Sequence, residues 1–297
     1  MPMKLLKTER DNQLIVERIM HAKSYSLTLD KAWCTGCGIC AEACPREAIE
    51  IIKFPREGGE KTKPPTVDID EQKCQYCGIC NTLCPFGALA LRIDGEPVIP
   101  VVEKESFPKL IRQIQVDPEK CDVKCGELCP LNLIKVSVKE GPEAEGARVL
   151  VALDRDRCPC CRMCEIRGPE GAFRVSKFLL GVIRINREKC PEGCHDCLDV
   201  CPITGTLYPS DDGKVYVNDA YCVYCGACKI VCPQEGALEL ERTYIRHTPV
   251  RSGAWNKALE KLTSTKEMTK ELRAKGLIRT RESLEKRLAP RGGIKGV

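Results

Sequence analysis

Short segments in which apolar and polar residues alternate recur six times along the chain. Such alternation predicts a β-strand with one buried face. Each segment is followed within a few residues by a cysteine, and in the complete repeats a Cys-Pro pair, a helical turn and a second alternating segment come next. An internal repeat of strand, cysteine loop, helix and strand is therefore the main organisational signal. The six first strands are expected at residues 26–30, 67–70, 114–117, 149–154, 182–186 and 215–218.

The first two repeats carry identical cysteine runs with the spacing Cys-x-x-Cys-x-x-Cys-x-x-x-Cys-Pro. Bacterial-type ferredoxins hold [4Fe-4S] clusters through this run, and its fourth cysteine ligates the other cluster of a pair. Two neighbouring runs should therefore exchange their last cysteines. The exchange predicts one cluster on Cys34, Cys37, Cys40 and Cys84 and a second on Cys74, Cys77, Cys80 and Cys44.

The last two repeats follow the same rule, although the earlier run has one extra residue between its first two cysteines. The inserted residue widens that loop beside Gly193. Exchange of the last cysteines predicts one cluster on Cys190, Cys194, Cys197 and Cys232 and another on Cys222, Cys225, Cys228 and Cys201.

The two middle repeats depart from this pattern. The earlier run lacks one of its loop cysteines, and the later run has Gly168 where its fourth cysteine is expected. One complete site remains, on Cys158, Cys161, Cys164 and Cys129. The other position could have lost its cluster, could hold a cluster with a non-cysteine ligand, or could bind another metal. We expect the loss, and hence five [4Fe-4S] clusters; the alternative is a sixth site on Cys121, Cys125 and Cys160.

The repeats predict an α+β protein with three tandem two-cluster ferredoxin-like modules and a C-terminal helical tail. Apolar positions in the N-terminal extension fall at helical spacing, which favours a short helix packed on the body. Residues 54–65 are rich in Gly, Pro, Lys and Glu, as in a solvated loop. Residues 254–289 show helical periodicity again. The expected boundaries are 1–24 for the extension, 25–100, 101–180 and 181–241 for the modules, and 242–297 for the basic tail.

The 23 cysteines of this 297-residue chain require a metal or a covalent explanation. Disulfide scaffolds need an oxidising compartment, yet the first twenty residues lack the apolar stretch of a secretion signal. No apolar run approaches the ~18 residues of a membrane helix, so we expect a cytoplasmic protein without a membrane span. Structural zinc prefers two ligand pairs, often with histidine. With 3 histidines in the chain, the regular cysteine triplets favour iron-sulfur clusters.

Charge divides the chain into two parts. Residues 242–297 contain 15 Lys and Arg against 5 Asp and Glu, so the rest of the chain is net acidic although the overall charge is +5. A basic helix can bind nucleic acid, but no nucleic-acid-binding motif accompanies this one. We therefore expect the tail to dock onto a protein partner or back onto the acidic body.

The sequence indicates no catalytic site of its own. It has neither a Gly-x-Gly-x-x-Gly dinucleotide loop nor a Gly-x-x-x-x-Gly-Lys-Ser/Thr phosphate loop, and no Ser-His-Asp or Cys-His candidate outside the cysteine runs. The five complete cluster sites leave no open iron position for a substrate. Electron transfer is the chemistry that remains.

The array of cysteine runs over residues 25–240 resembles the archaeal polyferredoxins, in which several two-cluster modules are fused. Residues 107–121 and 246–255 resemble, more narrowly, the polyferredoxin subunit of formylmethanofuran dehydrogenase. This resemblance implies delivery of low-potential electrons to a tungsten or molybdenum catalytic subunit that reduces carbon dioxide in methanogenesis. It also implies a heterodisulfide reductase or a ferredoxin as the electron donor.

Our preferred hypothesis is an electron-transfer subunit that relays single electrons through a chain of [4Fe-4S] clusters to the catalytic subunit of an anaerobic redox complex. The alternative is a free, diffusing multi-cluster carrier. A docking tail favours the fixed subunit. A third hypothesis, an assembly protein with purely structural clusters, predicts clusters that strong reductant does not reduce.

Removal of iron is expected to unfold the protein. Aromatic residues make up 5% of the chain, and small modules with thin apolar cores depend on a staple such as a metal. After chelation of the iron, the amide proton spectrum should collapse to the narrow range of an unfolded chain. A well-dispersed spectrum of the iron-free protein would contradict this expectation.

Overall fold

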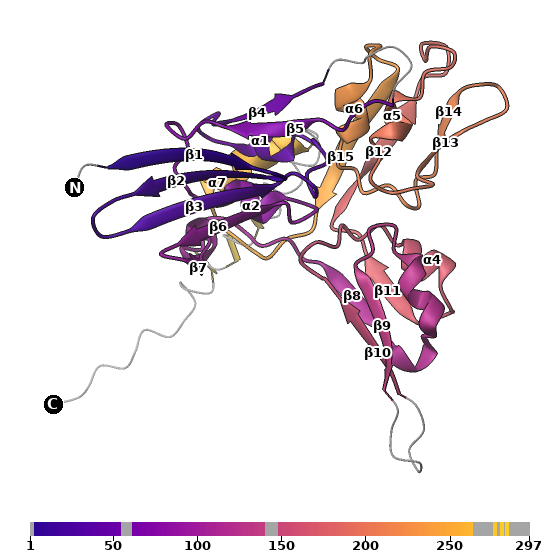
Figure 1. Ribbon diagram of the computed structural model, residues 1–297, viewed down its shortest axis with the longest axis horizontal. Coiled ribbons are helices and arrows are strands. Elements are labelled where there is room, and N and C mark those ends of the chain that lie inside the picture. The colour runs from indigo at the N-terminus through magenta and orange to yellow at the C-terminus, as the bar shows by residue number, and fades with distance from the viewer. Residues whose placement is uncertain are drawn as a thin grey trace.

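The computed structural model describes residues 3–54, 61–139, 148–263, 276–277, 280–281 and 283–284. These residues form a mixed α/β protein of short helices and antiparallel strands. Three times along the described chain, an outer pair of strands brackets an inner pair in sequence. We call the three repeats the first, middle and third units. In Figure 1 the first unit lies on the left, the third at the upper right and the middle unit at the lower right.

The first unit is built on two antiparallel strand pairs. The outer pair joins β3 (Ser24–Asp30) to β6 (Leu89–Ile93), and the inner pair joins β4 (Ile49–Ile52) to β5 (Thr66–Ile69). Alternate residues of these strands face the core, as the sequence pattern predicts. The short strand β7 (Glu96–Pro97) extends the outer pair and is followed by helix α3 (Pro100–Glu103).

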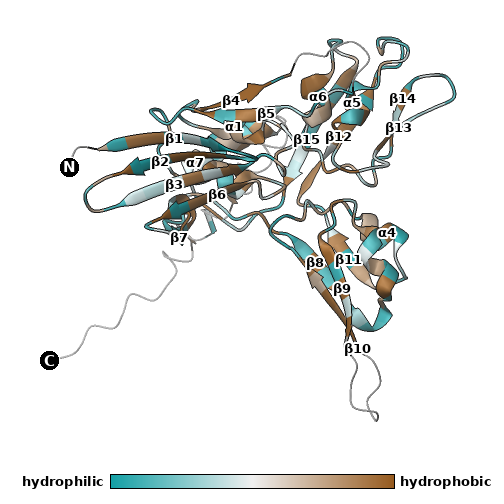
Figure 2. Cartoon of the chain, in the orientation of Figure 1, coloured by the Kyte–Doolittle hydropathy of each residue, from teal (hydrophilic) through white to brown (hydrophobic). Residues whose placement is uncertain are grey.

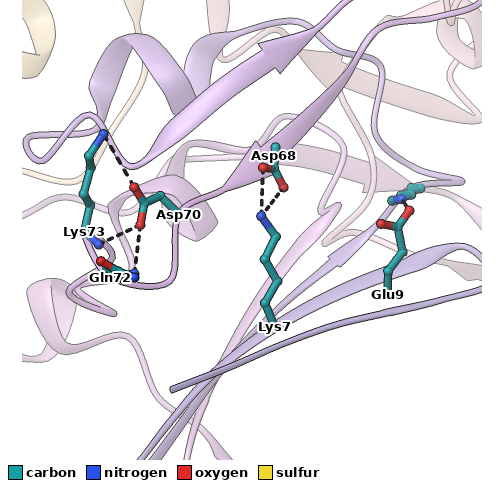
Figure 3. Close-up of polar contacts among 7 residues, drawn as sticks. Lys7, Glu9, Asp68, Asp70, Gln72 and Lys73 are labelled. Carbon is teal, nitrogen blue, oxygen red and sulfur yellow. Dashed lines mark hydrogen bonds and ion pairs between the residues drawn. The ribbon is translucent and has the colours of Figure 1, made fainter. Parts of the chain in front are cut away.

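The N-terminal segment is a β-hairpin, so the expectation of a short helix is wrong. Strands β1 (Lys4–Arg10) and β2 (Gln13–Ile19) pair with each other, and β2 continues the sheet by pairing with β3. Leu14 and Val16 are both buried, which is the period of a strand rather than of a helix. An ion pair of 2.7 Å between Lys7 and Asp68 joins the hairpin to β5 (Figure 3).

The middle unit repeats the strand pairing but replaces its first helix. β8 (Gln113–Val116) pairs with β11 (Phe173–Ser176), and β9 (Ile134–Lys139) pairs with β10 (Arg148–Leu153). Its second half contains helix α4 (Met163–Arg167). Its first half contains two 3₁₀ helices instead, η1 (Pro118–Lys120) and η2 (Val123–Leu128). The altered cysteine spacing of this half thus coincides with an altered backbone.

The third unit pairs β12 (Leu179–Ile185) with β15 (Leu238–Ile245) and β13 (Leu207–Pro209) with β14 (Val215–Val217). Its helices are α5 (Asp196–Asp199) and α6 (Ala227–Val231). Strand β15 continues past the boundary expected at residue 241, because Arg242, Tyr244 and Ile245 still pair with β12. The loop between β13 and β14 is hydrophilic, whereas α6 is largely hydrophobic (Figure 2).

The short helices lie inside the cysteine runs, not after the Cys-Pro pairs as expected. In the first unit, α1 (Ile39–Ala43) and α2 (Ile79–Leu83) each end immediately before the fourth cysteine of the run. That cysteine is extended, with φ −67° and ψ 117° at Cys44. The proline that follows disfavours a helical conformation at this residue, so the Cys-Pro pair acts as the stop signal.

Helix α7 (Gly253–Leu262) folds back onto the first unit. Ser252 caps its N-terminus by accepting a hydrogen bond from the N–H of Ala254 (3.1 Å). Trp255 is fully buried, in edge-to-face contact with Phe107 at a centroid distance of 5.1 Å. The apolar face of α7 belongs to the same core as α1 and α2. The tail therefore docks on the body of the chain over this helix; most of its expected continuation lies outside the described residues.

The expected loop at 54–65 also falls largely outside the described residues. Residues 61–65, which are described, contain neither helix nor strand. Among the helices that the structure describes, none is both long enough and apolar enough to cross a membrane.

Substitution of Trp255 by Ala is expected to destabilise the protein by about 3–5 kcal/mol, the usual cost of truncating a fully buried Trp. The thermal unfolding midpoint of the iron-loaded protein, measured by circular dichroism, tests this. Leu277→Ala is the matched control, because Leu277 is 74% exposed and its truncation should change stability by less than about 0.5 kcal/mol. Equal midpoints for both variants would mean that α7 does not stabilise the body.

Candidate iron-sulfur centres

An Asp or Asn at the end of a strand begins each of the six cysteine loops. Its side-chain oxygen accepts a hydrogen bond from a backbone N–H two or three residues later, which forms an Asx turn. Asp70, for example, accepts from the N–H groups of Gln72 (2.9 Å) and Lys73 (3.1 Å), as Figure 3 shows. The same turn thus directs all six loops away from their strands. The six residues are Asp30, Asp70, Asp117, Asp154, Asn186 and Asn218.

A left-handed residue after the second cysteine turns four of the runs into their short helices. This residue is Gly38, Gly78 and Gly226 in the first and third units, with φ between 76° and 99°. Glycine adopts such angles without steric cost. The middle unit has Arg162 there with φ 68°, so it keeps the loop geometry without glycine. At Gly226 a side chain would also crowd the guanidinium of Arg242, 3.1 Å from the Cβ position.

In the first unit the structure gathers the cysteines into the two quartets that exchange of the fourth cysteines predicts. Cys44, Cys74, Cys77 and Cys80 line one apolar cavity. In the other quartet, burial first and then the neighbouring thiols, among them Cys37, Cys84 and Cys34, raise the pKa of Cys40 above its ordinary value. The fourth cysteine of each run therefore lies with the three loop cysteines of the other run.

The remaining three quartets each surround an apolar cavity of their own. In the third unit the first cavity is lined by Cys190, Cys194, Cys197 and Cys232, and the second by Cys201, Cys222, Cys225 and Cys228. In the middle unit the cavity is lined by Cys129, Cys158, Cys161 and Cys164. The widened loop beside Gly193 still brings Cys190 and Cys194 to the same cavity.

The surroundings of the thiols suit a cofactor that binds thiolates. Burial raises the pKa of Cys161 to about 11 and that of Cys164 to about 12, so a metal must displace their protons. Backbone N–H groups then favour the charged sulfur by donating to it. Such bonds, of 3.2–3.4 Å, run from Ala48 to Cys44, from Ala88 to Cys84, from Leu133 to Cys129 and from Tyr224 to Cys222.

The quartets fit an iron-sulfur cluster better than a single ion. Zinc needs four ligands at about 2.3 Å from one centre. Among the described residues, no three Cys, His, Asp or Glu side chains converge closely enough to hold one metal ion. The thiols instead stand around cavities lined by apolar side chains, such as those of Ile114, Leu153 and Val175 in the middle unit. A cubane cluster, with its thiolate ligands at the corners, suits such a space.

The structure does not bring Cys160 to Cys121 and Cys125. The last two are buried together beside Phe173, and burial followed by the Cys125 thiol raises the pKa of Cys121 to about 12. Cys160 is fully buried in a different apolar cluster, with its thiol 3.9 Å from the carbonyl oxygen of Cys158. It occupies, at φ 58°, the left-handed loop position taken by Tyr76 and Tyr224 in the other units. It therefore fills the core as those tyrosines do.

Sequence reasoning did not predict the contacts that two arginines make with the cysteine loops. Arg112 donates to the carbonyl oxygens of Cys84 in the first unit and Cys158 in the middle unit. Arg242 donates to the carbonyl oxygen of Cys225 in the third unit and to the carboxylate of Glu42 in the first. No spacing rule marks them, because each lies far in sequence from one or both of the loops it contacts. The strand-end Asx residues, by contrast, recur at the same place in every repeat and could have been read from the sequence.

Comparison with known proteins agrees with these centres. Residues 33–88 and 182–233 each match a family described as a 4Fe-4S dicluster domain. Two curated relatives are the polyferredoxin-like subunit of the aliphatic sulfonate oxidoreductase of Pyrococcus furiosus (29% identical over 97 residues) and formate hydrogenlyase subunit 2 of Escherichia coli (32% over 97 residues). The matches cover 29% and 30% of this chain, and the chain spans about half the length of these relatives, 55% and 46%.

A solved structure extends the likeness to nearly the whole chain. A chain of the formate dehydrogenase, heterodisulfide reductase and formylmethanofuran dehydrogenase complex from Methanospirillum hungatei superimposes with a TM-score of 0.75 and 33% sequence identity. The match covers 88% of this chain and 92% of that one. Taken with the dicluster domains and the polyferredoxin-like relative, it shows that the chain belongs to the archaeal polyferredoxins.

Proposed function

We propose that the protein is an electron-transfer subunit that relays single electrons through five [4Fe-4S] clusters. The observation that carries the proposal is the gathering of twenty cysteines into five quartets, four of them seen as apolar cavities. A cluster supplies one-electron redox chemistry, and the protein sets its potential through charge, hydrogen bonds and burial. The ligands would be Cys34, Cys37, Cys40 and Cys84; Cys74, Cys77, Cys80 and Cys44; Cys158, Cys161, Cys164 and Cys129; Cys190, Cys194, Cys197 and Cys232; and Cys222, Cys225, Cys228 and Cys201.

The units would then be three ferredoxin modules, two with a pair of clusters and the middle one with a single cluster. Their repeated strand pairing and the helices inside the cysteine runs support this division. In the middle module, Cys121 follows η1 and Cys125 lies on η2, and both share one apolar cluster with Ala172 and Phe173. Two cysteines lie together there and Cys160 lies in another apolar cluster, so we assign this position no cluster.

The protein would serve a multi-subunit redox complex, with formylmethanofuran dehydrogenase as the preferred acceptor. The matched Methanospirillum hungatei chain belongs to a complex that contains this enzyme, a heterodisulfide reductase and a formate dehydrogenase. The curated relatives are also named as subunits, one of an aliphatic sulfonate oxidoreductase and one of a formate hydrogenlyase. Electrons would enter from a heterodisulfide reductase or a ferredoxin and leave to a tungsten or molybdenum subunit. A freely diffusing carrier is the alternative.

Iron analysis tests the cluster assignment. The anaerobically purified protein should contain about 20 iron atoms, from five clusters of four. Cys164→Ala should lower this to about 16, because it removes a ligand of one cluster. Cys125→Ala is the matched control and should keep about 20, since Cys125 belongs to no quartet. About 24 iron atoms in the unaltered protein, falling to about 20 in Cys125→Ala, would restore the sixth cluster.

An anaerobic pull-down from the native host tests the role. The tagged protein should co-purify with a molybdopterin-containing subunit in a fixed ratio. If it instead elutes alone with its full iron content and reduces several unrelated enzymes, the freely diffusing carrier becomes the preferred hypothesis. Clusters that stay oxidised in strong reductant would overturn both roles.

A further inference from the structure

Arg242, on strand β15 of the third unit, fills the contact between a quartet of the first unit and one of the third. Its side chain is 7% exposed. The guanidinium donates to the carbonyl oxygens of Tyr224 (3.0 Å) and Cys225 (2.6 Å). It also forms an ion pair of 3.2 Å with Glu42 on α1. One cationic side chain thus joins the loop of the Cys225 quartet to the helix that follows Cys37.

The surrounding backbone makes this contact tight. A Cβ on Gly226 would lie 3.1 Å from Arg242 and 3.6 Å from the carbonyl oxygen of Cys37. A Cβ on Gly38 would lie 3.0 Å from the side chain of Ile230. Gly38 and Gly226, which each follow a quartet cysteine, therefore lie within contact distance of the other unit, and the lack of a side chain at both positions favours this close approach.

Arg112 makes an equivalent contact between the first and middle units. Its Nε donates to the carbonyl oxygen of Cys158 and its Nη2 to that of Cys84, both at 3.0 Å. The guanidinium lies over the ring of Phe178, with 5.0 Å between Cζ and the ring centroid. Cys158 belongs to the quartet of the middle unit, and Cys84 to the same first-unit quartet that Arg242 approaches through Cys37.

One apolar cluster lies among the three quartets that these arginines connect. Phe86, Cys161 and Cys225 are buried members, and Cys37 and Cys84 pack against it. Cysteines of the first, middle and third units therefore meet around shared side chains. Each of the other two quartets lies next to a quartet of its own unit. In the first unit Cys80 is close to Cys40, and in the third unit Cys197 is close to Cys228. These two quartets lie outward from the shared cluster.

We infer that the quartet of Cys34, Cys37, Cys40 and Cys84 is a junction where the relay branches, and that Arg242 and Arg112 are the positioning residues that couple it to the Cys222 and Cys158 quartets. This inference rests on the proposed electron relay. Electrons then pass between the first and third units directly, not through the middle unit that separates them in sequence. The Cys74 and Cys190 quartets end two arms, and the middle unit forms the third.

Charge gives the arginines a measurable effect. A guanidinium stays protonated in proteins, and low exposure weakens the screening of its field. A nearby positive charge stabilises the reduced, more negative form of a cluster and so raises its reduction potential. Each arginine should therefore raise the potentials of the two quartets that it connects. The reduction potential of the first-unit quartet should be raised by both arginines.

The test is an EPR-monitored reductive titration of the isolated iron-loaded protein, fitted with five midpoints. Arg242→Met should move two midpoints to more negative values, and Arg112→Met should move two. In the double variant one midpoint, that of the shared quartet, should move by about the sum of the single shifts. Arg242→Lys keeps the charge, so its midpoints should stay close to those of the unaltered protein. Arg184→Met, on the exposed face of β12, is the matched control and should move none.

Glu42→Gln provides a second test in case the Arg242 variants lose their clusters. It removes a carboxylate beside Arg242 and leaves the bonds to Tyr224 and Cys225 in place. It should shift the same two midpoints in the opposite direction. Five unmoved midpoints in the Arg242 and Glu42 variants, at full iron content, would overturn the junction and leave the relay standing. Absence of reducible clusters from the unaltered protein would instead remove the relay itself.

Discussion

Convergence of four thiols on one apolar cavity is the constraint on which the rest of this structure depends. Each quartet draws three cysteines from one loop and one from the other half of its unit. Burial, and then the neighbouring thiols, raise the pKa values of Cys40 and Cys228. A cluster that binds thiolates therefore ties both halves of a unit together. The strands and short helices supply little more than the frame that holds six loops in position.

Much of the site could be predicted from the sequence, because ligand spacing is a local property. The exchange rule alone assigns Cys84 to the quartet of Cys34, and Cys129 to that of Cys158. The helical turns were misplaced because a ferredoxin loop folds between its cysteines, where Gly38 or Arg162 adopts a left-handed conformation. The N-terminal hairpin was missed because four apolar residues fit a helix as well as a strand. Pairing with β3, a tertiary contact, decides between the two.

The contacts between units lay beyond sequence reasoning. Arg242 reaches Glu42 across 200 residues, and Arg112 reaches two loops in different units. No arginine stands at the corresponding position of the other units, so no periodicity reveals either one. Units with similar cysteine runs are therefore distinguished by the side chains at their boundaries. The order of the centres in space follows from these side chains and not from their order along the chain.

Helix α7 has a consequence for the making of the protein. The apolar face formed by α1 and α2 is completed by residues that follow all three units in the chain, among them Trp255 and Leu259. During synthesis that face stays uncovered until residues 253–262 have left the ribosome, after all three units have emerged. Docking of α7 then completes the core that α1 and α2 begin. A helix translated after the three units thus seals the unit that was translated first.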